Sequence, residues 1–249
     1  DTTGPKRIGV HGDFLMLSFG RDKAASGVSG GAIITKNTSV ADLLKKEEEA
    51  ASELSFITIK RLLLYPFIYA VSKPLYGLIV GKCLLVAASK CGALVAVITK
   101  KEKEGYQSTE VHRMPAALCA LVRWEFKRFQ AINDHRRALS KIYAAAAAKH
   151  SWNFPSGIQE HLPLQKFPIL VPDADQVRMK LKRHNIHLDD GWTGASVCPR
   201  AVNQEAAGYI PGTCPKAQRL SGQILTLPTH PTMKQSQAHQ LIGILAKII

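Results

Sequence analysis

Residues 13–31 read DFLMLSFGRDKAASGVSGG, and our prediction of the fold starts from this stretch. Its apolar run, residues 14–17, is typical of a buried strand and leads through Ser18 into a turn. Lys23 lies in that turn, five residues after Ser18. A second apolar run, residues 32–35, is typical of another strand. The stretch therefore predicts a strand, a turn that presents one lysine, and a second strand.

Lys23 is the candidate reactive residue of the chain. A lysine amine attacks carbonyl carbons when burial or a neighbouring cation lowers its pKa, as it does in pyridoxal 5'-phosphate (PLP) enzymes. One lysine among 33 Lys and Arg residues says little by itself. Its position favours a role, because it closely follows a predicted strand and because Ser18 can donate to a phosphate. Three glycines downstream allow close approach of the backbone, namely Gly27, Gly30 and Gly31.

The composition is that of an α/β protein with an anionic partner. Of the 249 residues, 46% are hydrophobic and 21% are charged, which is ordinary for a globular protein with a large core. The formal net charge of +14 favours a nucleic acid, an acidic lipid or a phosphorylated small molecule. Because no nucleic-acid-binding motif is present, we expect no nucleic acid among the partners.

The cysteines and histidines predict neither a disulfide framework nor a metal centre. Five cysteines are an odd number, and no two of them form a C-x-x-C pair. His184 and His187 could share one face of a helix, but the sequence offers no third ligand, so we expect no metal. The cysteine usage and the lack of a signal-peptide pattern indicate the cytoplasm.

The remaining patterns alternate between helices and strands. A helix is expected over residues 40–54 after an Asn-Thr-Ser capping sequence. A long connecting helix is expected over residues 115–149, where apolar residues recur every three or four positions. Beyond it the expected elements are a strand at 167–171, a helix at 173–184 begun by an Asp173 cap, a strand at 224–227 and a helix at 233–248.

Residues 61–99 are apolar almost throughout and allow two interpretations. Each apolar piece is at most about as long as a bilayer-spanning helix and contains a lysine, which argues against a true membrane span. The first interpretation is a helical hairpin, broken near residues 73–74 and 81–82, that packs on the domain or on a partner subunit. The second is a monotopic insertion at the inner face of the membrane, with its lysines at anionic headgroups.

The stretch around Lys23 resembles the DegT/StrS family of PLP-dependent sugar aminotransferases. Members carry a strand that ends in Ser-Phe, a lysine a few residues later, and a Gly-Gly pair before the next strand. The matching residues here are Ser18-Phe19, Lys23 and Gly30-Gly31. The resemblance implies that Lys23 forms the Schiff base with PLP, the expected cofactor, and that Ser18 contacts the cofactor phosphate.

The resemblance continues towards the C-terminus. The family has an asparagine, an aromatic residue, Arg and Met before a long helix, and residues 111–114 here read VHRM. Val111 thus replaces the asparagine that reaches the PLP phosphate of the neighbouring subunit in the family. Residues 134–143 resemble a basic turn followed by a tyrosine. Residues 211–217 and 225–231 resemble the closing motif of the family.

Three further residues are expected near the substrate from their location in this fold class. Arg113 belongs to the matched segment before the long helix. Asp190 and Trp192 lie in a glycine-bounded loop that faces the substrate in one interpretation and is a surface turn in the other.

The resemblance covers most of the chain outside residues 61–105 and implies fold type I of the PLP-dependent transferases. The family aspartate that binds the pyridinium lies further upstream of the lysine than this chain reaches. We therefore expect the C-terminal part of a longer homodimeric enzyme, with no activity of the fragment alone. The implied segments are the C-terminal part of the large PLP-binding domain (1–60), an apolar helical insertion (61–105), a long connecting helix (106–150) and a small α/β domain (151–249).

The implied reaction transfers an amino group, from glutamate by the habit of the family, to a nucleotide-linked keto sugar. It would serve amino-sugar or cell-surface polysaccharide biosynthesis, and the diphosphate of the substrate suits the positive charge. Two alternatives stay open. One is a PLP-dependent sugar dehydratase of the same family, in which histidine typically replaces the lysine. The other is a non-catalytic, membrane-associated scaffold on a decayed aminotransferase fold.

Overall fold

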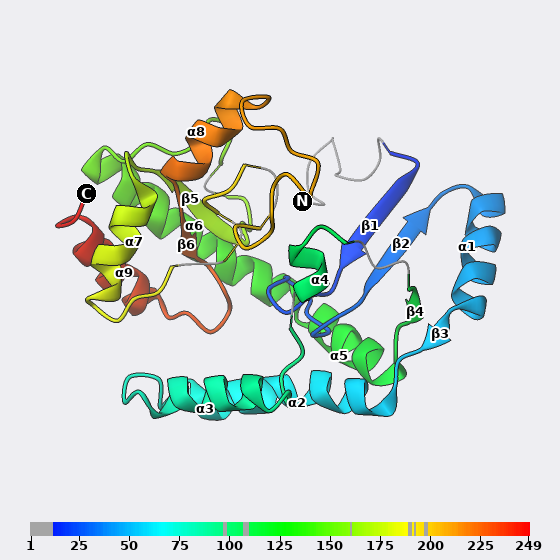
Figure 1. Ribbon diagram of the computed structural model, residues 1–249. Helices are drawn as coiled ribbons and strands as arrows, with labels where there is room; N and C mark the ends of the chain where they lie inside the picture. Colours follow the sequence, from blue (N-terminus) through cyan, green and yellow to red (C-terminus); the bar gives the residue numbers. More distant parts are fainter. Residues whose placement is uncertain are drawn as a thin grey trace. The chain divides into compact units, whose positions relative to one another are not determined.

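The computed structural model describes residues 12–96, 99–106, 110–159, 161–188, 191, 193–196 and 199–249. These residues belong to two compact units. Unit 1 comprises Asp1–Val97 and Thr109–Phe129, and unit 2 comprises Ile98–Ser108 and Gln130–Ile249. Helices and two-stranded sheets occur in the chain, so the α/β prediction is confirmed (Figure 1). The predicted division into four segments stays a prediction.

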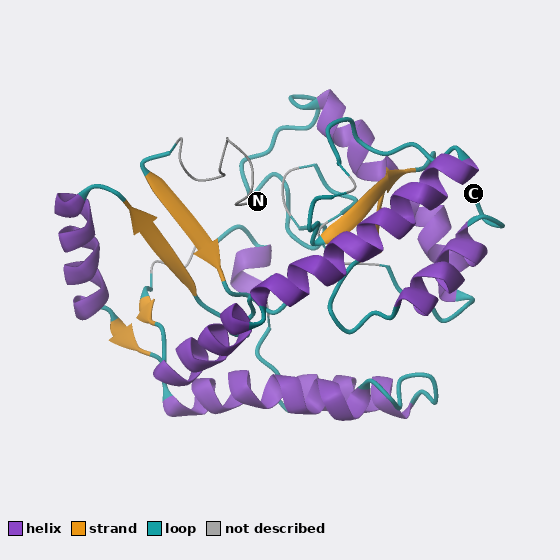
Figure 2. Cartoon of the chain, turned by 180° about the vertical axis from the view of Figure 1, so that it is seen from behind, coloured by secondary structure: helices purple, strands orange, loops and turns teal. Residues whose placement is uncertain are grey.

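Unit 1 contains Lys23. Its elements are β1 (Phe14–Ser18), β2 (Gly31–Thr35), α1 (Thr38–Ala50), β3 (Ser52–Glu53), α2 (Phe56–Ser72), α3 (Val80–Lys90), β4 (His112–Arg113) and α5 (Ala116–Lys127). β1 and β2 run antiparallel, with Ser18 opposite Gly31 (Figure 2). β3 and β4 form a short parallel pair. The predicted order of strand, lysine-bearing turn and strand is confirmed.

The prediction that β1 is buried is wrong. Met16 is 80% exposed and Phe14 is 53% exposed, while Leu15 and Leu17 are only half-buried. In the part of the chain that the structure describes, β1 pairs with β2 alone, so this sheet has two strands. An apolar run predicts a strand, but its burial depends on neighbouring strands and covering layers.

Helix α1 begins where the capping sequence predicts. The side chain of Asn37 accepts a hydrogen bond from the backbone N–H of Val40 at 3.2 Å, which satisfies one of the donors at the helix start. The helix ends at Ala50 instead of residue 54, because the chain then enters β3 and pairs with β4.

Helices α2 and α3 form a helical hairpin, as one interpretation of residues 61–99 predicts. The hairpin is antiparallel, because a Cβ on Gly92, just after α3, would touch the guanidinium of Arg61 near the start of α2. Gly81 allows the close turn, since a Cβ there would overlap the carbonyl oxygen of Ser72. The break predicted at residues 81–82 is wrong, because both lie in the first turn of α3. Of the helices in the described ranges, none has both the length and the apolar content that a bilayer crossing requires.

Unit 2 contains the elements predicted after residue 150. Its elements are α4 (Lys100–Lys103), α6 (Phe129–His150, of which the first residue is assigned to unit 1), β5 (Lys166–Leu170), α7 (Ala174–Lys182), α8 (Pro215–Gln223), β6 (Ile224–Pro228) and α9 (Gln235–Leu245). β5 and β6 are antiparallel, with Ile169 opposite Leu225. The predicted strands, the final helix and the Asp173-capped helix are confirmed within a few residues. Helix α8, which begins with Pro215, was not predicted.

The single helix predicted for residues 115–149 is two helices in the structure. α5 ends at Lys127 and α6 begins at Phe129, because Arg128 has φ −101° and ψ 0°. The N–H of Arg128 bonds to the carbonyl of Glu125 at 3.0 Å, which is a tighter turn than that of an α-helix. Apolar residues keep their spacing across Arg128, so the periodicity does not reveal this interruption.

The core of unit 2 is built around Tyr143 of α6. Its side chain is fully buried, and its ring centre lies 5.8 Å from that of Phe167 in β5. Its hydroxyl donates to the carbonyl of Pro228 at the end of β6, at 3.0 Å. Leu227 of β6 and Leu245 of α9 are also fully buried in this cluster. Tyr143 therefore ties α6 to both strands of the sheet.

Replacing Tyr143 with Phe keeps the buried ring and removes this hydrogen bond. We expect the free energy of unfolding to fall by about 1 kcal/mol at neutral pH, measured by urea unfolding. Burial raises the pKa of Tyr143 above its ordinary value of 10.0. The hydroxyl of Tyr143 therefore ionises at a lower pH in the unfolded state than in the folded state. The wild type should lose stability relative to the variant as the pH rises above 10.0.

The control for this prediction is Tyr106→Phe. Tyr106 belongs to unit 2 and is 67% exposed, so its replacement should leave the urea midpoint nearly unchanged at every pH. Equal effects of the two substitutions would contradict the role given to Tyr143.

Candidate functional site

The Lys23 turn runs from Phe19 to Gly30 and is closed by backbone hydrogen bonds. The N–H of Phe19 donates to the carbonyl of Gly30, and the N–H of Gly27 donates to that of Phe19, each at 2.9 Å. Within the turn, the N–H of Lys23 donates to the carbonyl of Gly20 at 3.1 Å, as in a β-turn. The backbone therefore holds Lys23 close to the end of β1.

Ser18 and Lys23 lie on either side of Gly20. The N–H of Gly20 donates to the Oγ of Ser18 at 3.5 Å. A Cβ built on Gly20 would lie 3.7 Å from Ser18 Oγ and 3.9 Å from Lys23 Cγ, so both side chains border the same space. Ser18 is exposed and Lys23 is half-buried. The structure thus brings together the two residues that the sequence singled out.

Helix α5 supports the Lys23 turn through close contacts. Phe19 is buried, and its ring meets that of Phe126 edge-on with the centres 6.1 Å apart. At Gly27, a Cβ would lie 2.5 Å from Val122 Cγ2 and 3.2 Å from the carbonyl oxygen of Leu118. The contact between the turn and α5 therefore requires glycine at position 27.

The Gly-Gly pair at the end of the turn also reflects packing. Gly30 has a backbone φ of +107°, which residues with a side chain rarely adopt. A Cβ there would also lie 2.7 Å from Met114 Sδ. A Cβ on Gly31 would lie 2.6 Å from the carbonyl oxygen of Leu17 on the paired strand. Both glycines are needed for the chain to pass between β1 and the start of α5.

Arg21 ties the Lys23 turn to the helical hairpin. Its Nη2 donates to the carbonyl of Val95 at 2.6 Å, and its guanidinium lies 4.1 Å from the centre of the Tyr65 ring on α2. Burial lowers the pKa of Arg21 and raises the pKa of Tyr65. Arg21 nevertheless stays cationic in any ordinary solution, so the interaction with the ring persists.

Ser18 and Arg113 line one groove. The groove has a volume of about 940 Å³ and is bordered by β1, β2, α1 and β4. Arg113 Nε and Nη2 donate to the carbonyls of Glu48 and Glu49 at 3.2 and 2.6 Å. Arg113 therefore binds the C-terminal end of α1, which carries carbonyl groups without partners inside the helix. Its predicted contact with substrate stays a prediction.

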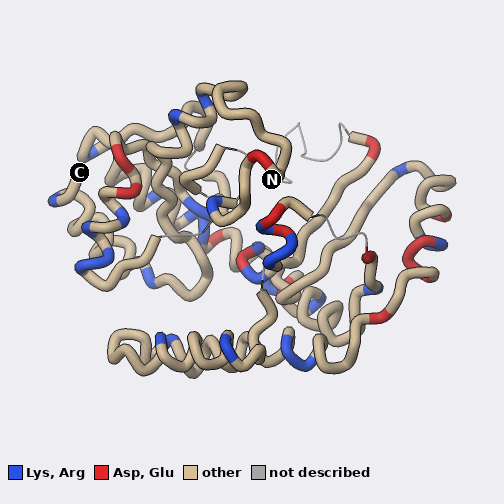
Figure 3. Tube along the Cα trace, viewed as in Figure 1, with Lys and Arg blue, Asp and Glu red and all other residues tan. Residues whose placement is uncertain are grey.

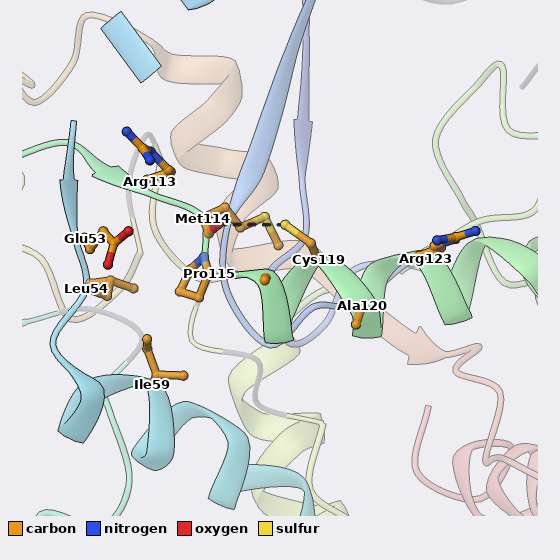
Figure 4. Close-up of a pocket in the computed structure, with 10 residues that line it drawn as sticks. Glu53, Leu54, Ile59, Arg113, Met114, Pro115, Cys119, Ala120 and Arg123 are labelled. Atoms are coloured by element: carbon orange, nitrogen blue, oxygen red, sulfur yellow. Dashed lines mark hydrogen bonds between the residues drawn. The ribbon is translucent and has the colours of Figure 1, made fainter. Parts of the chain in front are cut away.

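A second pocket, of about 720 Å³, lies between β3, the start of α2 and α5 (Figure 4). Two cationic side chains border it at opposite ends, Arg113 on β4 and Arg123 on α5. Glu53 lies near the Arg113 end, and Cys119 Sγ donates to the Met114 carbonyl at 3.8 Å. Most of the remaining lining is apolar, namely Leu54, Ile59, Pro115, Ala116 and Ala120. Such a pocket suits an anionic ligand with an apolar part.

A family model, that of the DegT/DnrJ/EryC1/StrS aminotransferase family, matches residues 88–246, more than half of the chain. The chain belongs to this family. The family that the sequence resemblance predicted is thereby confirmed. Aminotransferases of the DegT/DnrJ/EryC1/StrS family use PLP, which was the predicted cofactor.

Solved structures of similar proteins confirm fold type I. DesV from S. venezuelae, in complex with a ketimine intermediate, is 18% identical with a TM-score of 0.59, over 97% of this chain and 53% of that one. Spr1654 from Streptococcus pneumoniae in its PLP form is 15% identical with a TM-score of 0.62, and the match covers 98% of this chain and 53% of that one. An aminotransferase from Psychrobacter cryohalolentis is 16% identical with a TM-score of 0.60, and the match covers 95% of this chain and 57% of that one.

The chain spans about half the length of these structures. No curated protein sequence matches it. The residues matched by the DegT/DnrJ/EryC1/StrS model begin at 88, so Ser18 and Lys23 lie outside them. Their roles stay predictions that are supported by the geometry of the Lys23 turn. Val111, at the position of the family asparagine, is 72% exposed and cannot donate from its side chain.

Asp190 and Trp192 lie outside the described residues. Their described neighbours in the sequence, Gly191 and Thr193, are held by a network of hydrogen bonds and ion pairs. Arg200 bonds through its N–H to the carbonyl of Gly191 at 2.9 Å and through its guanidinium to both carboxylate oxygens of Asp175, at 2.7 and 2.6 Å. These bonds lower the pKa of Asp175, and burial acts in the opposite direction.

The buried Arg178 side chain extends this network. It donates to Asp175 at 2.9 Å and to Thr193 at 2.8 Å, so both sides of residue 192 are tied to α7. Sequence reasoning missed this pair. Its only signal was the three-residue spacing of Asp175 and Arg178 on a helix. In the described ranges, no group of three or more His, Cys, Asp or Glu residues is placed to hold a metal ion.

Gly27→Ala tests the contact between the Lys23 turn and α5. The added methyl group would overlap Val122, so we expect the free energy of unfolding to fall by about 1–3 kcal/mol in urea unfolding. Gly77→Ala is the control in the same unit, because a Cβ on Gly77 meets nothing within 4 Å. A loss at Gly77 as large as that at Gly27 would contradict the steric explanation.

Arg21→Ala tests the tie between the Lys23 turn and the hairpin. Loss of the hydrogen bond and the ring contact should lower the free energy of unfolding by about 1–3 kcal/mol. Amide hydrogen exchange in residues 19–30 should accelerate. Arg128→Ala is the control, since Arg128 also lies over an aromatic ring, 4.4 Å from the centre of Trp124, but its side chain is 48% exposed. Unchanged exchange in the Arg21 variant would show that the turn does not depend on this residue.

Proposed function

We propose that this chain carries the PLP-attaching lysine of an aminotransferase that acts on a nucleotide-linked keto sugar. The observation that carries the proposal is the placement of Lys23 and Ser18 around Gly20 in a turn with a closed backbone. Membership in an aminotransferase family supplies the reaction class. The sugar, the glutamate donor and the biosynthetic role come from the resemblance alone.

The residues of the turn fit the chemistry of PLP. The cofactor has an aldehyde and a phosphate, and an amine and a hydroxyl are the groups that react with the first and bind the second. Lys23 supplies the amine and the exposed Ser18 the hydroxyl. Gly20 leaves room between them, because it places no side chain in the space that both border. When bound, PLP supplies an electron sink that stabilises negative charge at the carbon bonded to the substrate nitrogen.

Lys23 would act twice in the transfer. Its amine would hold the cofactor at rest and would be free once the amino-acid substrate is bound. The freed Nζ then takes the proton from the α-carbon of that substrate, and general-base action of this kind contributes roughly 10²–10⁴-fold to the rate. The hydrogen bond between Lys23 N–H and Gly20 limits where the amine can reach. Ser18 would keep the cofactor phosphate at the end of β1.

The substrate would contribute a diphosphate, which suits the net charge of +14. Arg123 in the pocket of Figure 4 is a candidate phosphate contact, in addition to the predicted substrate residues Arg113, Asp190 and Trp192. We further propose a homodimer and a cytoplasmic location for the complete protein. The dehydratase alternative is disfavoured by Lys23, since histidine typically stands at that position in such enzymes of the family.

The test is covalent trapping of the cofactor on Lys23. The whole gene product is incubated with PLP and reduced with borohydride, and its peptides are analysed by mass spectrometry. We expect PLP on the Lys23 peptide, and loss of both this adduct and transaminase activity in Lys23→Ala. Lys36→Ala is the matched control, because Lys36 is an exposed lysine one residue after β2.

The outcomes of the trapping experiment separate the alternatives. A folded protein that traps no PLP would support the non-catalytic scaffold and overturn the proposal. Trapping at Lys23 without amino transfer to any keto sugar would overturn the substrate class and keep the lysine assignment. Equal loss of trapping in the Lys36 variant would show that the substitutions act through folding.

A further inference from the structure

The helical hairpin, residues 56–90, carries a large apolar surface that faces solvent in the described part of the chain. Phe67 is 71% exposed and Ile57 is 68% exposed. Single exposed apolar side chains are ordinary, whereas a contiguous set marks a surface that binds something. Further large apolar side chains exposed on this hairpin are Phe56, Leu64, Tyr69, Val71, Leu78, Ile79, Val80, Leu84 and Val86.

On α2 four of these side chains lie on one face. Ile57, Leu64, Phe67 and Val71 follow one another at steps of seven, three and four residues, which places them on the same side of a helix. A shallow groove of about 460 Å³ runs along the part of this face that Ile57, Leu64 and Phe67 line. Leu62 points away from it and is buried in the core of unit 1. Helix α2 therefore has one face against its own unit and a second apolar face towards solvent.

The charge of the hairpin region has a single sign. Residues 54–96 contain five Lys and Arg residues and no Asp or Glu. Figure 3 shows this as blue segments along α2 and α3 with no red segment between them. Helix α1 of the same unit, by contrast, carries both signs of charge, with two lysines followed by three glutamates at residues 45–49. An apolar surface combined with positive charge matches the surface of an anionic membrane.

Two lysines of the hairpin lie beside aromatic rings. Lys60 Nζ is 4.4 Å from the ring centre of Phe56, and Lys82 Nζ is 5.0 Å from that of Tyr76. A lysine in this arrangement can place its stem against apolar groups and its ammonium at a lipid phosphate. Aromatic side chains with polar tips are likewise favoured at the headgroup level of a bilayer.

The length of the hairpin favours binding along the membrane surface. Helix α2 has 17 residues, about 25 Å at the rise of an α-helix, which is less than the hydrocarbon thickness of a bilayer. The tip is apolar, with Leu78 71% exposed and Ile79 66% exposed. In Figures 1 and 2 this tip lies at the end of the hairpin that is distant from the strands of unit 1.

We propose that the α2–α3 hairpin docks this protein on the surface of an anionic membrane. The face formed by Ile57, Leu64 and Phe67 enters the headgroup region, and the lysines beside it bind lipid phosphates. A second copy of the chain is the less suitable occupant, because it would bring two positively charged hairpins together. The docking does not depend on the aminotransferase activity proposed above.

The test is co-sedimentation of the purified protein with vesicles. We expect binding to mixed phosphatidylserine and phosphatidylcholine vesicles, weaker binding to phosphatidylcholine alone, and a decrease at high salt. The double variant Ile57→Glu/Phe67→Glu should bind the vesicles at least about tenfold more weakly, because it adds negative charge to the inserted face. Both side chains are exposed, so the variant should keep its circular dichroism spectrum and its urea midpoint.

The control is Met179→Glu/Ile210→Glu. These residues are also exposed apolar side chains, at 61% and 69%, and the change in charge is the same. The control should bind like the wild type. Equal binding of all three proteins, or equal binding to both kinds of vesicle, would overturn the proposal. A dimer that dissociates only in the hairpin variant, without vesicle binding by the wild type, would assign this face to a second copy instead.

Discussion

The close contact between the Lys23 turn and helix α5 is the constraint on which the candidate site depends. At Gly27 the backbone of the turn lies so near Val122 that no side chain fits, and at Gly30 the same is true of Met114. Among the residues that the structure describes, the buried cluster at this contact is small and consists of Val28, Leu62 and Leu118 with partly buried neighbours. The position of Lys23 therefore rests on a few tight contacts and on the tie through Arg21, with little support from a broad core.

Unit 2 is held together differently. Its buried cluster joins α6, both strands, α7 and α9 through many large side chains, with Tyr143 and Phe167 at its centre. The network of Asp175, Arg178 and Arg200 then attaches the chain around residue 192 to α7. Large buried side chains thus join the helices and strands of unit 2, whereas hydrogen bonds from two arginines hold Gly191 and Thr193.

The local features of the fold could be predicted because their causes are local. The cap at Asn37, the cap at Asp173 and the apolar runs of β1 and β5 each depend on neighbouring residues alone. The break at Arg128 and the exposure of β1 could not be predicted, because a dihedral angle within a periodic pattern and the number of strands in a sheet leave no mark in the sequence.

Some residues of the candidate site could likewise be predicted from the sequence, and others could not. Ser18 and Lys23 were found from their spacing and from the resemblance to a family. The pairing of Arg113 with the end of α1 and of Arg21 with Tyr65 depends on contacts between residues distant in sequence. Long-range partners of this kind require the three-dimensional structure, since a charged residue in a sequence does not indicate its partner.

The two-stranded sheet of β1 and β2 has a consequence for handling the protein. In the described residues each strand has one neighbour, so the outer edge of each presents backbone N–H and C=O groups that no strand pairs. Met16 and Ile33, which face each other across the pair, are both exposed apolar side chains. Such an edge is a template for strand addition by another molecule. Concentrated solutions of this chain alone would therefore be prone to β-aggregation that begins at an edge of this strand pair.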